Sequence, residues 1–251
     1  DGSTDGTLPL LRNYEGSHAN IHVFEQKRSG LGRARNSVIP LITGRFTFFL
    51  DAGDVIDPRA LAKAVGEADQ READLLFTQY TVPRDEGDQP GDGVAADATV
   101  WKQLRRAQTN EERQVLAATL EGQPWNRLIR TTLLQDSNIF FGPTSAYDET
   151  PFHWHSIAMA ERISFASVSI VSRKKFTIRR RLSALSDAPS STAQEALRYT
   201  LERIAPLPSF TNLREHWLLF SRDVLSSIGD SSDRDQLHSS PQSPQPSAKD
   251  Q

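Results

Sequence analysis

Hydrophobic and polar residues follow two different periods along this chain, and these periods predict helices and strands in turn. Apolar residues at helical spacing predict helices over residues 8–14 and 58–69, the second of which opens with a proline. Runs that alternate, or that are rich in aromatic and β-branched residues, predict strands over residues 20–24, 45–50 and 73–80. Strands that alternate with helices indicate an α/β fold with a mostly parallel sheet.

The remaining segments predict helices and loops. The glycines that open residues 30–41 permit a tight turn into a helix. Helices are also predicted around residues 101–120, 195–204 and 213–228, the last with one apolar stripe. Residues 83–97 are rich in Asp, Gly and Pro and carry few bulky apolar side chains, so they predict a flexible loop that could act as a lid.

Composition limits the classes of protein to consider. The 251 residues are 37% hydrophobic, which is enough for one core with a helical annex. The formal net charge of −3 gives no overall attraction to nucleic acid, and the absence of cysteine excludes disulfides and thiolate metal sites. No apolar run approaches the roughly 20 residues that span a bilayer. We therefore expect no nucleic-acid partner and no membrane insertion, and a cytoplasmic location.

Two carboxylates follow directly on the strand predicted at residues 45–50. Asp51 and Asp54 lie at its carboxyl end, where open α/β sheets bind their ligands. Two carboxylates within one turn can share a Mg²⁺ or Mn²⁺ ion, which would neutralise phosphate oxygens. The alternative is structural, because Asp54 or Asp57 could cap the helix that follows.

Five stretches of the chain carry recognisable motifs: DGSTDGT at residues 1–7, GLGRARN at 30–36, FFLDAGDVIDP at 48–58, QPWNRLIR at 123–130 and YDETPF at 147–152. In this order they resemble the motifs of GT-A-type glycosyltransferases of the large inverting family 2. One such motif is weak evidence, but five in order at plausible spacing are strong together. The resemblance covers about residues 1–186 and implies the GT-A fold, a Rossmann-like fold that binds a nucleotide-diphospho-sugar.

The resemblance also implies an organisation in three parts. Residues 1–186 would form the GT-A domain, residues 187–230 a helical extension, and residues 231–251 a disordered tail rich in Ser, Pro and Gln. Asp1 matches the second of two family aspartates that follow the second strand. We therefore expect a first strand and a first helix to precede the given sequence.

Several residues acquire donor-side roles from the resemblance. Asp1 would contact the nucleotide base, and Arg35 with Asn36 would lie on the phosphate side. The alternative for Arg35 is a surface residue that caps a helix or pairs with a carboxylate. Trp125 and Asn126 would lie near the donor sugar or the acceptor, although a core tryptophan fits the sequence nearly as well.

The metal site is where the chain departs from the family pattern. The usual second metal carboxylate falls at Gly53, which leaves Asp51 and Asp54 on either side. Asp54 could substitute for it, or the site could bind Mn²⁺ or Mg²⁺ weakly. Alternatively, cationic side chains and helix dipoles could stabilise the diphosphate leaving group.

The catalytic base implied by the resemblance also departs from the pattern. The family carries Glu-Asp where this chain has Asp148 and Glu149, so Glu149 holds the position of the base that deprotonates the acceptor hydroxyl. Either residue could instead cap a helix that starts at Pro151. His153 and His155 follow two residues apart on this helix, so they cannot share one face, and we expect one to be packed and the other exposed.

Six cations lie within residues 173–181, at Arg173, Lys174, Lys175 and residues 179–181. They could contact a diphosphate, an anionic acceptor, or a membrane surface that carries a lipid-linked sugar. Alternatively, they could protect a solvated edge strand.

The expected function is therefore transfer of a sugar, from a UDP-sugar or related donor, to a glycan or lipid-linked hydroxyl acceptor in cell-surface polysaccharide synthesis. No Q-x-x-R-W sequence is present, which favours transfer of single residues over processive synthesis. The alternatives are a degenerate, non-catalytic GT-A module that binds nucleotide or glycan, and a related nucleotidyltransferase.

Overall fold

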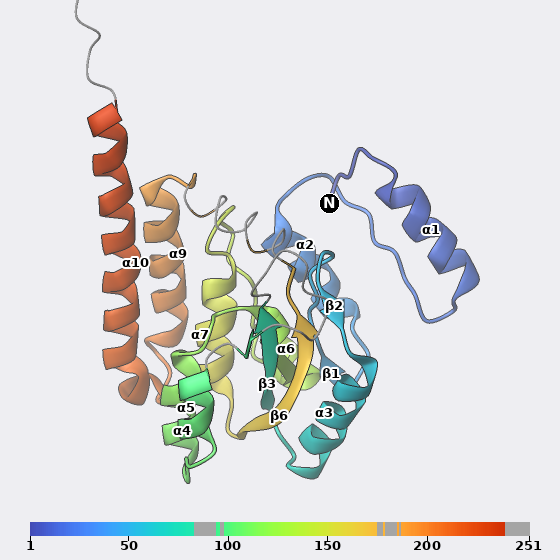
Figure 1. The fold of residues 1–251 in the computed structure, drawn as a ribbon, viewed down its shortest axis with the longest axis horizontal. Helices are drawn as coiled ribbons and strands as arrows, with labels where there is room; N and C mark the ends of the chain where they lie inside the picture. Colours follow the sequence, from blue (N-terminus) through green and yellow to red (C-terminus); the bar gives the residue numbers. More distant parts are fainter. Residues whose placement is uncertain (83–93, 96–97, 175–177, 179–184, 186, 239–251) are drawn as a thin grey trace, which may run out of the picture.

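The structure is a computed structural model that describes residues 1–82, 94–95, 98–174, 178, 185 and 187–238. Its elements alternate between helices and strands in the first half and are mainly helical in the second (Figure 1). In chain order they are α1 (Thr7–Ser17), α2 (Leu31–Val38), η1 (Ile39–Leu41), β1 (Phe46–Thr47), β2 (Val55–Ile56), α3 (Pro58–Gln70), β3 (Leu75–Val82), β4 (Val94–Ala95), α4 (Ala98–Leu104), α5 (Asn110–Ala118), η2 (Pro124–Asn126), β5 (Arg127–Arg130), α6 (Thr131–Asp136), α7 (Glu149–Met159), β6 (Ile163–Ser172), α9 (Ser190–Ile204) and α10 (Phe210–His238).

The strands form one sheet in the order β1-β5-β3-β6-β2, and β4 pairs with the end of β3. Among the described strands only β3 and β6 run parallel, and the other four pairings are antiparallel. The expected α/β layer fold is confirmed, but the expectation of a mostly parallel sheet is wrong for the described strands. The reason is that the short strands β2, β4 and β5 run opposite to the central pair, and β1, which runs with that pair, borders only β5.

The central strand β3 divides the apolar residues between two cores. Leu75 and Phe77 point to one face, where they pack with α5, α7, α9 and α10. Leu76 and Tyr80 point to the other face, where they pack against small residues of α3. Successive side chains of a strand point to opposite faces, so an almost continuous apolar run is buried on both sides.

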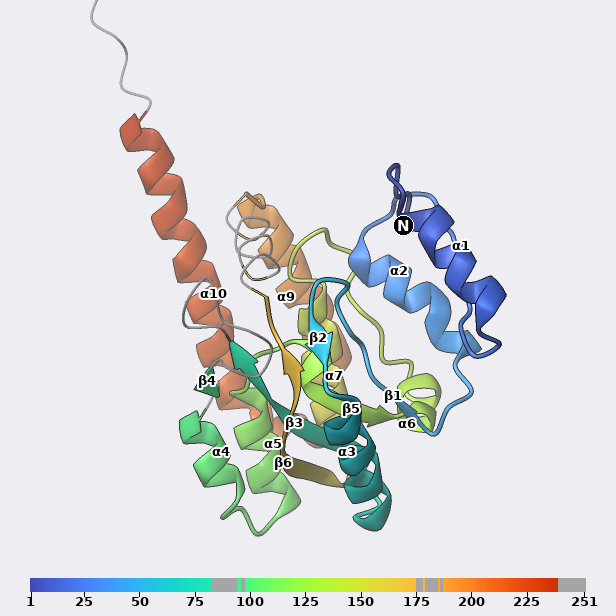
Figure 2. The ribbon, with the colours of Figure 1, turned by 45° about the vertical axis from the view of Figure 1, so that its right-hand side comes forward.

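Two long helices cover the α7 side of the sheet. Figures 1 and 2 show α9 and α10 side by side at one edge of the molecule and α1 at the opposite edge. Trp154 of α7 packs edge-on against Trp217 of α10, with ring centroids 5.0 Å apart. Burial of such large rings contributes strongly to the association of α10 with α7. No helix in the described ranges is both long enough and apolar enough to span a membrane.

Most helices lie where the sequence predicts them. The predictions over residues 8–14, 30–41 and 58–69 correspond to α1, to α2 with η1, and to α3. Asp57 caps α3, because its carboxylate accepts hydrogen bonds from the N–H groups of Arg59 and Ala60. The helices predicted around residues 101–120, 195–204 and 213–228 are α4 with α5, α9 and α10.

Three local predictions differ from the structure. Residues 20–24 form no strand within the described chain, because the Val23 N–H donates to the Glu15 side chain (2.8 Å) in place of a ladder partner. The strand predicted over residues 45–50 shortens to β1. α10 continues to His238, past the expected start of the tail at residue 231. Of the predicted lid, residues 83–93 and 96–97 lie outside the described residues, as do 239–251 of the tail.

Candidate functional site

The turn that contains Asp51 and Asp54 is held between two arginines from distant parts of the chain. Arg35 of α2 donates from Nη2 to Asp51 Oδ1 at 2.6 Å. Arg173, the first residue after β6, brings Nε to 2.7 Å from Asp54 Oδ2 and Nη2 to 4.0 Å from Asp51 Oδ2. The sequence predicted both aspartates, but it did not predict that each would already be paired with a guanidinium.

Aromatic rings fix both guanidinium groups. The Arg173 guanidinium lies 4.1 Å from the ring centroid of Trp125, and that of Arg35 lies 4.9 Å from the ring of Phe141. Trp125 is buried and packs edge-on against Tyr80 of β3 at 4.6 Å. A cation over an aromatic face is stabilised by the ring quadrupole, so these rings hold the arginines toward the turn. Trp125 is a core residue that also supports Arg173.

These carboxylates do not provide a ready site for a divalent cation. A Mg²⁺ or Mn²⁺ ion needs several unpaired oxygen ligands, but Asp51 and Asp54 each face a guanidinium. Across the described ranges, no group of three His, Cys, Asp or Glu side chains is arranged to hold a metal ion. As folded, the residues at this turn do not fit the metal that the family resemblance implies.

Asn36 and Asn126 make structural hydrogen bonds. The Asn36 amide donates to the carbonyl of Phe141 (3.0 Å) and accepts from its N–H (2.8 Å), which ties α2 to the segment before α7. The Asn126 amide donates to the Glu121 carbonyl at 2.7 Å, and its oxygen accepts from Arg127 Nε at 3.0 Å. Both side chains therefore position backbone near the site.

Asp1 anchors the loop that leads into α2. Its carboxylate accepts hydrogen bonds from the backbone N–H groups of Ser29 (2.7 Å) and Gly30 (3.1 Å) and from the Gln26 amide (2.9 Å). Gly30 has a positive φ of 98°, which a glycine adopts without strain. Asp1 thus fixes the turn that presents Arg35 on the following helix.

Asp148 and Glu149 are both buried at the first turn of α7. Asp148 Oδ2 lies 4.0 Å from Arg35 Nη1, on the side of α2. Burial, the neighbouring charge of Glu149 and a hydrogen bond with Glu149 raise the pKa of Asp148 to about 8, against the opposing effect of Arg35. The protonated form of Asp148 is therefore favoured at neutral pH. It is the N-cap residue of α7 but makes no capping hydrogen bond with its side chain, so the capping alternative is wrong for Asp148.

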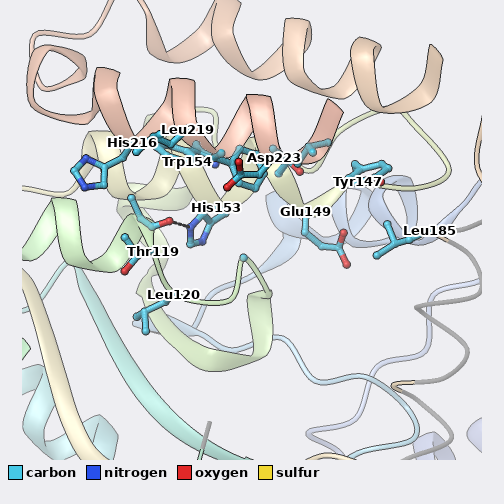
Figure 3. A pocket seen from close by; sticks show the side chains of 15 residues that line it. Thr119, Leu120, Tyr147, Glu149, His153, Trp154, Leu185, His216, Leu219 and Asp223 are labelled. Atoms are coloured by element: carbon cyan, nitrogen blue, oxygen red, sulfur yellow. Dashed lines mark hydrogen bonds between the residues drawn. The ribbon is translucent and has the colours of Figure 1, made fainter. Parts of the chain in front are cut away.

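Glu149 faces a pocket of about 370 Å³ between α5, α7 and α10. Figure 3 shows Glu149 and Leu185 at one end of this pocket and His216 at the other. Much of the lining is apolar or aromatic, and includes Tyr147, Trp154, Leu185, Leu219, Phe220 and Val224. A concave, largely apolar pocket with a few polar groups is the usual form of a small-molecule site. No pattern in the sequence indicated this pocket, because its walls come from three separated helices.

A fully buried arginine connects η2 to α7. Arg127 donates to the Gln123 carbonyl (3.0 Å), and its Nη2 lies 2.8 Å from His153 Nδ1. Burial lowers the pKa of Arg127 to about 9 and, with the Arg127 charge, lowers the pKa of His153 well below its usual value. A neutral His153 therefore accepts at Nδ1. The sequence analysis did not single out Arg127, although a charged residue directly after Trp-Asn and before an apolar strand is a usable signal.

One further expectation is wrong. His153 and His155 are both buried, since α7 is covered on all sides, so neither is the exposed member of the pair. Of the cationic segment, Arg173 is buried in ion pairs at the end of β6, a strand that lies between β3 and β2. The alternative for Arg35 is right in one part, since its side chain is buried and not at the surface but does pair with the carboxylate of Asp51. Residues 175–177 and 179–181 of the cationic segment lie outside the described residues.

The fold is of the GT-A class, which the solved structures described below share. The chain belongs to glycosyl transferase family 2, whose family model matches residues 1–137. The glycosyltransferase EpsJ of Bacillus subtilis, described as uncharacterised, is 25% identical over 174 residues, which are 65% of this chain and 47% of EpsJ. The poly(ribitol-phosphate) β-N-acetylglucosaminyltransferase TarS of Staphylococcus aureus is 26% identical over 170 residues, 66% of this chain and 27% of TarS. The chain thus spans less than half of either relative.

Solved structures share the fold. Residues 1–349 of S. aureus TarS in complex with UDP-GlcNAc match with a TM-score of 0.62 and 20% identity, over 92% of this chain and 61% of that one. The mannosyltransferase PcManGT of Pyrobaculum calidifontis, in complex with GDP-Man and Mn²⁺, matches with a TM-score of 0.54 and 16% identity, over 95% of this chain and 65% of that one.

Proposed function

We propose that the chain transfers a sugar from a UDP-sugar to a hydroxyl acceptor, with inversion at the anomeric carbon. The observation that carries this proposal is the position of the Asp148–Glu149 pair, because Asp148 lies 4.0 Å from Arg35 of the arginine-aspartate cluster and Glu149 lines the pocket. Family membership and the UDP-GlcNAc complex of TarS support a UDP-sugar as the donor.

The donor side is formed by the cluster around Asp51. Arg35 lies in α2 and supplies a fixed cation. The loop anchored by Asp1 sets the position of this helix. A guanidinium presents several N–H donors in a plane, which suits the oxygens of a diphosphate. Asp51 would accept a hydrogen bond from a ribose hydroxyl or orient Arg35 toward the phosphates. Trp125, which packs against Arg173, and Asn126, which positions the neighbouring backbone, support the donor side.

Glu149 would act as the general base. Its carboxylate takes the proton of the acceptor hydroxyl while that oxygen attacks the anomeric carbon and the bond from this carbon to the diphosphate oxygen breaks. The electron pair of that bond leaves with the diphosphate, and UDP is released. Asp148 would lie beside Glu149 in its protonated form, because burial raises the pKa of Asp148 to about 8.

The acceptor would occupy the pocket beside Glu149. Its aromatic and apolar walls suit the faces of a sugar ring or the apolar part of a lipid-linked glycan, and Asp223 and His216 offer polar contacts. The curated relative TarS acts on poly(ribitol-phosphate), which supports a role in cell-surface polysaccharide synthesis. We also propose a cytoplasmic location and a peripheral membrane contact through the cations of residues 174–181, since Arg173 itself is buried.

A second candidate is a non-catalytic GT-A module that binds nucleotide or glycan. The observation that favours it is the pairing of Asp51 and Asp54 with arginines, since this turn differs from the metal-binding pattern of the family. Such a module would bind UDP without turning over a UDP-sugar.

The test measures the release of UDP from UDP-glucose, UDP-galactose and UDP-GlcNAc. A coupled assay monitors this release with and without acceptor glycans. Glu149→Gln should lower turnover about 10²–10⁴-fold, the usual contribution of a general base. Glu161→Gln, which changes an exposed glutamate just past α7 in the same way, should leave turnover unchanged. UDP binding by the wild-type protein with no turnover of any donor would instead support the non-catalytic module.

A further inference from the structure

Arg173 places a cationic side chain at the two carboxylates where the sequence predicted a metal ion. Its Nε lies 2.7 Å from Asp54 Oδ2, and its Nη2 lies 4.0 Å from Asp51 Oδ2. The Arg173 side chain is 4% exposed and that of Asp54 is fully buried. Arg173 therefore contacts both carboxylates that would have bound a divalent cation.

Packing holds Arg173 in this position. Its backbone N–H donates to the Thr81 carbonyl at 3.0 Å, which continues the pairing of β6 with β3. Its guanidinium stacks on the buried indole of Trp125 at 4.1 Å. The residue is fixed at both ends, unlike a surface cation that moves aside when a metal binds.

The charges of the cluster already balance. Asp51 and Asp54 carry two negative charges when ionised, and Arg35 and Arg173 carry two positive charges. A divalent cation placed on these carboxylates would lie within a few Å of two guanidiniums, and like charges at this distance repel strongly where water is excluded. The sequence is consistent with this balance, since Gly53 removes the carboxylate that the family pattern has between the two aspartates.

We propose that Arg173 takes the place of the divalent cation at the Asp51–Asp54 turn, so that the chain binds a nucleotide diphosphate without a metal ion. Arg173 neutralises the two carboxylates. Arg35 is then left to contact the diphosphate. The inference rests on the proposed function only for the choice of UDP as the probe.

The first experiment titrates UDP calorimetrically into the wild-type protein, once in EDTA and once in Mn²⁺. We expect the two Kd values to agree within about twofold. Binding that requires Mn²⁺ would overturn the inference and leave the proposed function intact.

The second experiment removes the cation. In Arg173→Ala the two carboxylates lose their shared partner, so we expect UDP binding in EDTA to weaken at least tenfold and to recover in part when Mn²⁺ is added. Mn²⁺ alone should also bind Arg173→Ala more tightly than the wild type. A variant that gains no response to Mn²⁺, while circular dichroism shows it to be folded, would contradict the inference.

The matched control is Arg130→Ala. Arg130 also pairs with an aspartate, with Nε 3.6 Å from Asp74 Oδ1, and its guanidinium also stacks on a ring, at 5.0 Å from Phe46. This variant should bind UDP like the wild type and gain no Mn²⁺ site. If UDP binds under no condition, the UDP-sugar donor of the proposed function is wrong. The Mn²⁺ titrations then still decide the inference, because a wild-type Mn²⁺ site lost in Asp51→Asn would overturn it and a site gained only in Arg173→Ala would support it.

Discussion

Asp148 and Glu149 are neighbours in the chain, but their carboxylates lie in different surroundings at the start of α7. Asp148 points toward Arg35 and α2, and Glu149 lines the pocket against α10. Tyr147, with a positive φ of 60°, precedes this pair and marks the sharp turn into the helix. One helix terminus therefore supplies one acidic group to each side of the proposed reaction.

The raised pKa of Asp148 makes a prediction about stability. Between about pH 4 and pH 8 the folded chain holds a proton on Asp148 that the unfolded chain has released, so the free energy of unfolding falls as pH rises through this range. In Asp148→Asn this decline should be smaller by up to about 1.4 kcal/mol per pH unit. Urea denaturation at pH 5, 6.5 and 8 measures it. Asp136→Asn, at an exposed position, should keep the wild-type slope, and an unchanged slope in Asp148→Asn would refute the prediction.

His155 predicts a pH dependence of the opposite sign. Burial and the charge of Arg203 lower its pKa to about 4, so the unfolded chain binds a proton between about pH 6.5 and 4 that the folded chain does not. The free energy of unfolding therefore falls as pH drops through this window, by about 2 kcal/mol at pH 5 from this residue. His155→Phe should remove that loss, and His22→Phe at an exposed position should not. Equal losses from pH 7 to pH 5 in His155→Phe and wild type would contradict the assignment.

Gly32 permits the close approach of α2 to the start of α7. A Cβ at this position would lie 2.8 Å from Asp148 Oδ2 and 2.9 Å from the carbonyl oxygen of Gly142. Gly32→Ala should therefore destabilise the fold by about 1–3 kcal/mol, the usual cost of overpacking, and displace Asp148. Gly66→Ala in α3 is the control, since its Cβ would meet nothing within 4 Å and alanine favours a helix interior. We expect Gly66→Ala to be as stable as wild type or more so, and a Gly32→Ala chain of wild-type stability in thermal melts would show that α2 can move away.

Substitutions of two adjacent leucines of α10 distinguish an effect on acceptor binding in the pocket from a general effect of a charge on the helix surface. Leu219 lines the pocket beside Glu149, whereas Leu218 does not, and both side chains are about half exposed, at 49% and 58%. Leu219→Asp should raise the acceptor KM several-fold and leave the donor KM unchanged, because it places a charge on an apolar wall. Leu218→Asp should change neither. Steady-state kinetics at saturating UDP-sugar measure both constants, and equal effects of the two substitutions would show that the acceptor binds elsewhere.

The local patterns of the chain determined most of its helices. α3 follows from apolar spacing, from the proline at its first position and from Asp57 as its cap, and all of these act within a few residues. The motif order also predicted the family, because GLGRARN, DAGD and YDETPF each carry their side chains on a local turn or helix end. The two aspartates, Arg35 and the Asp148–Glu149 pair do lie together in the structure, as the motifs implied.

Tertiary structure decided which groups these residues face. Arg173 is more than a hundred residues from Asp51, and only the pairing of β6 with β3 and the burial of Trp125 bring its guanidinium to the turn. The pocket beside Glu149 exists because α10 packs on α7 through Trp154 and Trp217. Periodicity and capping are set by residues close in sequence, whereas ion pairs and pockets depend on segments that meet only when the core is buried. A sequence pattern can therefore name the carboxylates of this site, and only the fold decides whether a metal ion or an arginine neutralises them.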